Sequence, residues 1–93
     1  MQGSLRVEDG VVRLEGDLTL AHATRLLAEG KAAIQAGARG VDLSGAGQLD
    51  SSAISLLLCL RRHAQASGVE LELRALPESL LSLAKLYGVD EHL

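Results

Sequence analysis

The sequence contains almost no aromatic side chains: Tyr87 is the only one, and Phe and Trp are absent. Surfaces that bind nucleic acids or sugars commonly use aromatic rings as stacking platforms, so neither platform is expected here. Basic residues are also few, because nine Lys and Arg face twelve Asp and Glu, giving a formal net charge of −3. This balance argues against nucleic acid or an anionic membrane surface as the main partner.

The side chains that metal and redox chemistry would need are equally scarce. Cys59 is the only cysteine, which excludes an internal disulfide and a cysteine zinc cluster. The three histidines lie in separate segments with no His-x-x-x-His pair, so a metal site is not expected; they are His22, His63 and His92.

Catalytic motifs are likewise missing. The segment Gly45-Ala46-Gly47 lacks the third glycine of a dinucleotide loop and the Gly-Lys-Ser/Thr of a nucleotide-binding loop. A nucleophile pair of Ser51 and His63 is excluded, because twelve helical residues separate the two by roughly 18 Å. We therefore predict no catalytic residue and no cofactor, and the chain is not expected to be an enzyme.

Long hydrophobic runs are absent too. The longest apolar stretch, Leu56–Leu60, is far too short to span a bilayer, and Met1–Arg6 lacks the basic start and apolar run of a signal peptide. Apolar residues still make up 47% of the chain, enough for a packed core. The sequence predicts a single domain over residues 1–93, located in the cytoplasm.

The first half of the chain predicts a hairpin, a helix and a strand. Alternating apolar residues on both sides of Asp9-Gly10 indicate a β-hairpin. Thr19 is a plausible N-cap for a helix over residues 20–36, which Gly37 ends. Residues 40–43 read as a buried strand, and residues 44–49, with two glycines, as a loop.

The second half predicts a helix over residues 51–67, a strand over residues 69–74 and a helix after Pro77. On the first of these helices five apolar residues fall within one arc, which should face the core: Ala53, Ile54, Leu57, Leu60 and Ala64. The last helix carries a second apolar stripe formed by Leu80, Leu83, Ala84 and Tyr87. The order β-β-α-β-α-β-α predicts an α/β fold, with a mixed sheet of about four strands and helices packed on one face.

The start of the helix at residue 51 is the main candidate site. Asp50, Ser51 and Ser52 follow a strand and a glycine-containing loop, where parallel-sheet folds commonly place ligands and partners. Capping the helix is the simplest role for these oxygen-bearing side chains, but one residue suffices for it. At least one hydroxyl should therefore stay exposed.

The face of this helix opposite the core arc carries small side chains and one Arg in place of the usual Lys and Glu. Its residues are Ser52, Ser55, Cys59, Arg62 and Ala66, with Leu56 and Leu58 beside them. Small side chains allow a partner helix to approach closely, and Arg is favoured at interfaces. We expect Leu56 and Arg62 to contact a partner rather than the core. The alternative is a surface that merely tolerates small side chains and binds no partner.

Asp50-Ser51-Ser52, between an apolar strand and an apolar helix, resembles the Asp-Ser-Ser-Gly-Leu-Gly signature of STAS domains, the anti-sigma-factor-antagonist fold. Gly16-Asp17-Leu18 resembles their Gly-Glu-Leu-Asp, and the element order matches over essentially the whole chain. One branch fits better: Val41–Ser44, Leu49–Ser51, Leu56–Leu58 and Ser82–Tyr87 look like the small cytoplasmic STAS subunit of Mla phospholipid-transport ABC transporters of Gram-negative bacteria.

This resemblance implies a non-catalytic subunit that binds the transporter's ATPase subunit and, through it, the membrane permease, and so supports outer-membrane lipid asymmetry. Such a subunit would be peripheral to the inner membrane without inserting into it. The implied binding residues are Asp50, Ser51, Ser52, Ser55, Leu56, Cys59 and Arg62. The alternative is an anti-sigma factor antagonist phosphorylated at Ser51. Ala53 and Ile54 in place of the signature Gly-Leu weaken that alternative more than the subunit role.

Overall fold

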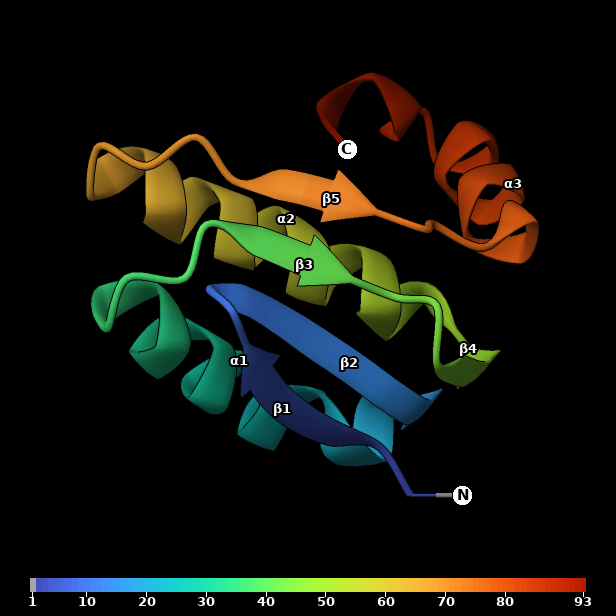
Figure 1. Ribbon diagram of the computed structural model, residues 1–93. Helices are drawn as coiled ribbons and strands as arrows, with labels where there is room; N and C mark the ends of the chain where they lie inside the picture. Colours follow the sequence, from blue (N-terminus) through green and yellow to red (C-terminus); the bar gives the residue numbers. More distant parts are fainter. Residues whose placement is uncertain (1) are drawn as a thin grey trace.

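A computed structural model describes residues 2–93 of the chain (Figure 1). The strands are β1 (Ser4–Glu8), β2 (Val11–Leu18), β3 (Gly40–Asp42), β4 (Ala46–Leu49) and β5 (Glu72–Arg74). The helices are α1 (Leu20–Gln35), α2 (Ser51–Ala66), α3 (Glu78–Leu86) and the short 3-10 helix η1 (Asp90–His92).

The predicted hairpin joins β1 and β2. The two strands pair antiparallel with Glu8 opposite Val11, so that Asp9 and Gly10 alone form the turn. Both turn residues have positive φ, 50° for Asp9 and 75° for Gly10. A two-residue hairpin turn of this kind requires that backbone, which Asp-Gly adopts readily.

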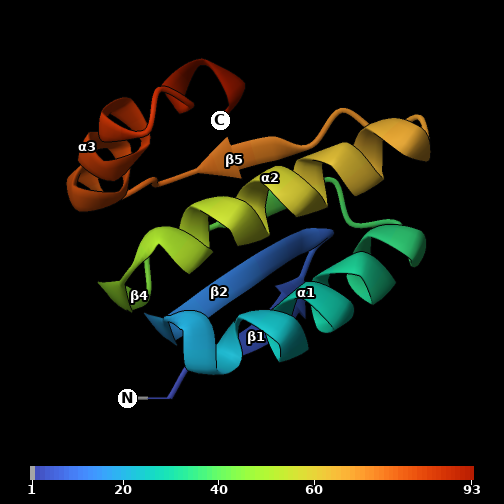
Figure 2. The same cartoon turned by 180° about the vertical axis from the view of Figure 1, so that it is seen from behind.

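The strands form one mixed sheet in the order β1-β2-β3-β5, with β2, β3 and β5 parallel to one another. Helices α1 and α2 lie side by side across one face of the sheet, and α3 lies beside α2 near the end of β5 (Figures 1 and 2). The predicted α/β fold, with a mixed sheet and helices on one face, is confirmed.

The sheet has five strands, because residues 46–49, predicted as loop, form β4. Strand β4 runs parallel to β2 and occupies the place beside β2 where β3 has ended. Its pairing is short and irregular: Gly16 faces Ala46 and Leu18 faces Leu49, with a shift of register between them. The glycines of this segment suggested a loop, but its pairing depends on a partner strand about thirty residues away in the sequence.

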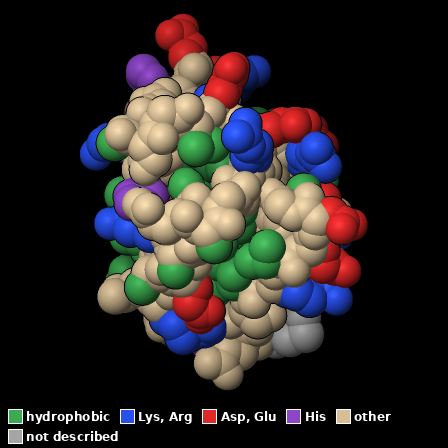
Figure 3. Space-filling view, turned by 60° about the vertical axis from the view of Figure 1, so that its left-hand side comes forward, with side chains coloured by type: hydrophobic (Ala, Val, Ile, Leu, Met, Phe, Trp, Pro, Cys, Tyr) green, Lys and Arg blue, Asp and Glu red, His purple; other side chains and the backbone are tan. Residues whose placement is uncertain are grey.

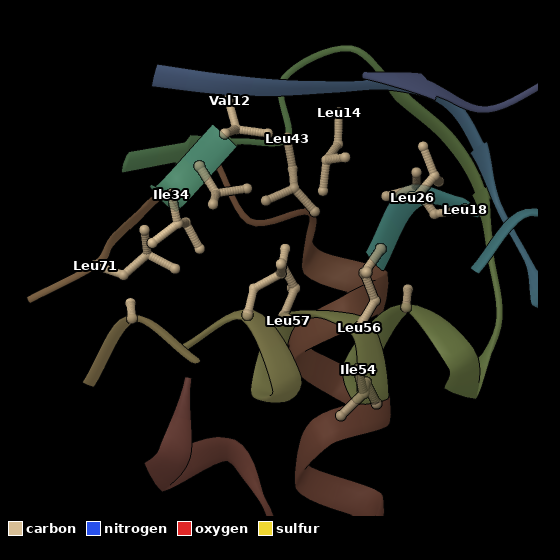
Figure 4. Packing of buried hydrophobic residues seen from close by; sticks show 14 of the residues in the cluster. Val12, Leu14, Leu18, Leu26, Ile34, Leu43, Ile54, Leu56, Leu57 and Leu71 are labelled. Carbon is tan, nitrogen blue, oxygen red and sulfur yellow. The ribbon is translucent and has the colours of Figure 1, made fainter. Parts of the chain in front are cut away.

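The core lies between the sheet and the two long helices. Side chains of Val12, Leu14 and Leu43 project from the sheet layer toward Leu57 of α2 (Figure 4). All five residues of the predicted core arc of α2 are buried. Helices α1 and α2 approach closely at Gly30, where an added Cβ would come within 2.6 Å of Cδ2 of Leu60. Glycine is therefore required there for the two helices to pack.

The third helix departs from its prediction at one residue. Pro77 stands directly before α3, and Leu80 and Ala84 are fully buried, as expected. Tyr87, placed in the same apolar stripe, is 56% exposed. It is the C-cap residue of α3, at the end of the helix, and it lines an open groove beside Ile54 and Leu58 of α2 instead of packing in the core.

The other face of the sheet is open and carries ion pairs. Arg6 contacts Glu15 at 3.1 Å, and Arg13 contacts Glu8 at 2.8 Å across the hairpin. Acidic and basic side chains are interspersed over the surface seen in Figure 3, with small hydrophobic patches between them. Within residues 2–93, no helix is long and apolar enough to cross a bilayer.

Candidate functional site

Strands β2 and β4 bring the starts of α1 and α2 together. The two strands are parallel and Leu18 pairs with Leu49, so the carboxyl ends of both strands lie together at the same end of the sheet. Helix α1 begins two residues after Leu18 and α2 two residues after Leu49. The two helix N-termini therefore lie next to each other at one end of the molecule (Figure 2).

Asp50 caps both of these helices. Its Oδ1 accepts the backbone N–H of Ser52 at 2.9 Å, and its Oδ2 accepts the backbone N–H of Leu20, the first residue of α1, at 3.1 Å. Oδ1 also accepts the hydroxyl of Ser52. These bonds, above all the one from the Ser52 hydroxyl, hold the pKa of Asp50 below its ordinary value because they stabilise the carboxylate.

Capping by Asp50 changes what the neighbouring hydroxyls do. Thr19 stands at the N-cap position of α1 as predicted, but its side chain makes no capping hydrogen bond. The hydroxyl of Ser52 is donated to Asp50. Ser51 is exposed, and its hydroxyl has no hydrogen-bond partner within residues 2–93. The expected spare hydroxyl at this helix start is thus that of Ser51.

The predicted binding face of α2 is exposed except at Leu56. Ser55 and Arg62 are exposed and Cys59 is partly exposed. Leu56 is only 3% exposed and belongs to the core, so the expectation that it avoids the core is wrong. The reason is that α1 packs along α2 and widens the buried arc beyond the width that periodicity indicates.

Two shallow grooves flank the exposed ridge of α2. The first, of about 210 Å³, lies between α1 and α2 and is mostly apolar, with Leu56 and Cys59 among its lining residues. Leu20, on its other side, is 75% exposed. The second, of about 270 Å³, runs between α2 and the end of α3; its lining residues are Ser51, Ile54, Ser55, Leu58, Tyr87 and Val89. Ser55 lines both grooves.

Asp17 fixes the segment that leads into α2. Its Oδ1 accepts the backbone N–H of Gln48 at 2.9 Å, and this bond is the main cause that lowers the pKa of Asp17. Gly47 passes so close that an added Cβ would lie 2.6 Å from the same oxygen. The sequence pointed to Gly16-Asp17-Leu18 through its resemblance to a family motif. Nothing in the sequence showed that the Asp17 carboxylate accepts the backbone N–H of Gln48.

No group of three or more His, Cys, Asp or Glu side chains in the described part of the chain is placed to hold a metal ion. What the site offers is an exposed hydroxyl and two apolar grooves around a capped helix start. Such a surface suits contact with another protein.

Comparison with known structures supports the fold. The chain resembles the anti-sigma factor antagonist SpoIIAA in its unphosphorylated form, with a TM-score of 0.67 and 18% identity over 91% of this chain and 83% of that one. It also resembles a protein called Mglu, with a TM-score of 0.56 and 25% identity over 81% of this chain. This match spans only 19% of the Mglu chain.

Among curated proteins, none matches the chain. The family model described as "Mlab, STAS domain" matches residues 1–93, the whole sequence. The fold, with its opening hairpin, parallel strands and helix-covered sheet face, agrees with that of SpoIIAA. The chain therefore belongs to the STAS domain family, in the group described as Mlab.

Proposed function

We propose that this protein is a non-catalytic MlaB-like subunit of a phospholipid-transport ABC transporter, and that it binds and supports the ATPase subunit. Through that subunit it would associate with the membrane permease at the inner membrane and serve outer-membrane lipid asymmetry. The family model described as Mlab supports this proposal. So does the sequence resemblance in the residues around Ser51 and near the C-terminus.

The observation that carries the proposal is the exposed, unbonded hydroxyl of Ser51, which lines the groove between α2 and α3 next to Ile54 and Leu58. The groove between α1 and α2 begins at the next residue, Ser52. Helix capping does not require this hydroxyl, because Asp50 caps α2. Burial of the flanking apolar surface would supply most of the binding free energy. A hydroxyl buried by the contact would supply specificity, because it must find a hydrogen-bond partner once water is excluded.

Substitution of Ser51 tests this role. We expect Ser51→Thr to keep binding to the ATPase subunit, Ser51→Ala to weaken it, and Ser51→Glu to abolish it. A glutamate there would lie beside Asp50, and a close-packed partner would have to bury its charge. The measurement is the Kd for the purified ATPase subunit from the same organism, together with ATPase activity of the assembled transporter.

Ser79 provides the matched control. It is exposed and lies in the first turn of α3, so Ser79→Glu adds the same charge at a helix start away from both grooves. Binding of the ATPase subunit should stay within about twofold of the parent. Equal binding by the Ser51→Glu variant and the parent would contradict the proposal.

The second candidate function is that of an anti-sigma factor antagonist controlled by phosphorylation at Ser51. The structural likeness to SpoIIAA favours it. The N-terminus of α2 would accept a phosphate through the helix dipole, although Asp50 would repel it. Mass spectrometry of the protein isolated from cells distinguishes the two: stoichiometric phosphoserine at position 51 would favour this second function.

A further inference from the structure

Arginine side chains fall into two groups according to their ion pairs. Of the seven arginines in the sequence, four form ion pairs with carboxylates: Arg6, Arg13, Arg25 and Arg74. The remaining three have no carboxylate within ion-pair distance in residues 2–93: Arg39, Arg61 and Arg62. Two of these unpaired arginines are neighbours in the second half of α2.

Arg61 and Arg62 line one depression of about 290 Å³ between α2 and the C-terminal segment. Gln65 and His92 add polar groups, Leu58 and Val89 complete the lining, and no carboxylate takes part. The guanidinium of Arg61 is held in place by a hydrogen bond from its Nη2 to the carbonyl of Leu71 at 3.0 Å. Its Nε is buried without a hydrogen-bond partner. The depression is thus cationic, with the Arg61 guanidinium fixed by its hydrogen bond and the Arg62 side chain exposed.

This cationic depression continues the groove between α2 and α3. Leu58 and Val89 line both, so the two adjoin along α2 and can be covered together by one elongated partner segment. The sixteen residues of α2 correspond to a length of roughly 24 Å. The combined surface is apolar at the Ser51 end, where Ile54 and Tyr87 lie, and cationic at the Arg62 end. We refer to it as the α2–α3 channel.

We infer that the α2–α3 channel receives an amphipathic helix of the protein partner, with apolar side chains facing Ile54, Leu58 and Tyr87 and carboxylates at the end that meets Arg61 and Arg62. Helices commonly bind to grooves through a stripe of apolar side chains. An Arg pair in an open depression gains little from a free small anion, because water screens the charges. Carboxylates tethered to an apolar helix avoid that loss, because the apolar contact excludes water around them.

The inference rests on the proposed function only in taking the ATPase subunit as the protein that carries this helix. A synthetic probe tests the channel without that subunit. The probe is an amphipathic helical peptide with a leucine stripe and two glutamates in its last turn, or in its first turn to allow for either direction. The comparison peptides carry glutamine in place of glutamate. Binding is followed through the backbone amide signals of the isotope-labelled protein.

One glutamate peptide is expected to shift the signals of Leu58, Arg62 and Val89 and to bind roughly fivefold or more tightly than its glutamine counterpart. Arg62→Glu should remove this preference. Arg39→Glu should keep it, since Arg39 is also exposed and unpaired but does not line the channel. Equal binding of the glutamate and glutamine peptides, or signal shifts confined to other regions, would overturn the inference.

The ATPase subunit separates this inference from the proposed function. If the parent protein binds that subunit more weakly at high salt, and Arg62→Glu lowers the affinity tenfold or more while Arg39→Glu does not, the channel is its binding site. If Arg62→Glu binds as tightly as the parent, the inference fails and the proposed function stands. If the subunit does not bind at all, the proposed function fails, and the peptide result alone decides the inference.

Discussion

The carboxylate of Asp50 accepts the backbone N–H of Leu20 at 3.1 Å, although the two residues are thirty positions apart in the sequence. The same carboxylate caps its own helix through Ser52. One side chain thereby satisfies free N–H groups at the starts of both α1 and α2. This arrangement depends on the parallel pairing of β2 and β4, which places the two helix starts together.

Replacing Asp50 by Ala should destabilise both helix starts. Loss of an N-cap costs about 1 kcal/mol, and loss of the additional hydrogen bond to Leu20 about 0.5–1.5 kcal/mol more. We therefore expect the free energy of unfolding to fall by about 2 kcal/mol, measured by urea denaturation. Ser51→Ala is the control and should change it by less than about 0.5 kcal/mol, since Ser51 caps nothing. Equal losses in the two variants would contradict the assignment of Asp50 as the cap.

Acid should weaken the protein through the same carboxylate. The pKa of Asp50 is lower in the folded protein than its ordinary value of 3.8, so the folded state favours the ionised form. Its contribution is present above about pH 4 and is lost as the pH falls through the lowered pKa. Urea denaturation between about pH 6 and pH 2.5 should show a smaller loss of stability with acid in Asp50→Asn than in the parent. Equal losses of unfolding free energy with acid in the two proteins would contradict this role of the Asp50 carboxylate.

Leu56 should behave as a core residue. It is 3% exposed, and its neighbour Leu57 is fully buried. Leu56→Ala and Leu57→Ala should each lower the free energy of unfolding by about 2–5 kcal/mol, as truncation of a buried leucine does. Arg62→Glu, on the exposed side of the same helix, should change it by no more than about 0.5 kcal/mol. A loss below about 1 kcal/mol for Leu56→Ala would restore the view that this side chain faces outward.

Gly30→Ala should be destabilising in spite of alanine's higher helix propensity. The added methyl group would lie 2.6 Å from Cδ2 of Leu60, a fully buried side chain with little room to move. Overpacking costs about 1–3 kcal/mol, against a propensity gain of about 1 kcal/mol. A double-mutant cycle with Leu60→Ala supplies the control. The Gly30→Ala change should be less harmful, or stabilising, once Leu60 is shortened.

Local signals in the sequence were enough for the hairpin and the long helices. Asp9-Gly10 specifies its turn through backbone preference alone, and the spacing of Ala53, Leu57 and Leu60 identifies the inner face of α2. Gly37 ends α1 where expected, with φ at 111°. Each of these features depends on residues within a few positions of one another.

Features that depend on contacts between distant segments could not be predicted. Strand β4 exists because β2 is free to pair beyond the end of β3, and its own residues have little strand character. The burial of Leu56 depends on α1. At the candidate site, the motif from Asp50 to Ser52 was recognisable, but the sequence did not show which of its side chains caps a helix and which stays free of hydrogen bonds. Only the folded chain shows that Asp50 reaches Leu20 and leaves the Ser51 hydroxyl unbonded.

The separation of the helix layer from the open, ion-paired sheet face has a consequence for which side of the protein can be labelled without touching the grooves. Each chain has one α2, and the grooves beside it lie on the helix side, away from the face that carries Arg13 and Glu15. A partner that binds through these grooves contacts the helix side of the protein. Because the grooves and the ion-paired face lie on opposite sides of the sheet, a fluorophore attached at the exposed residue Arg6 would stand on the side away from the grooves.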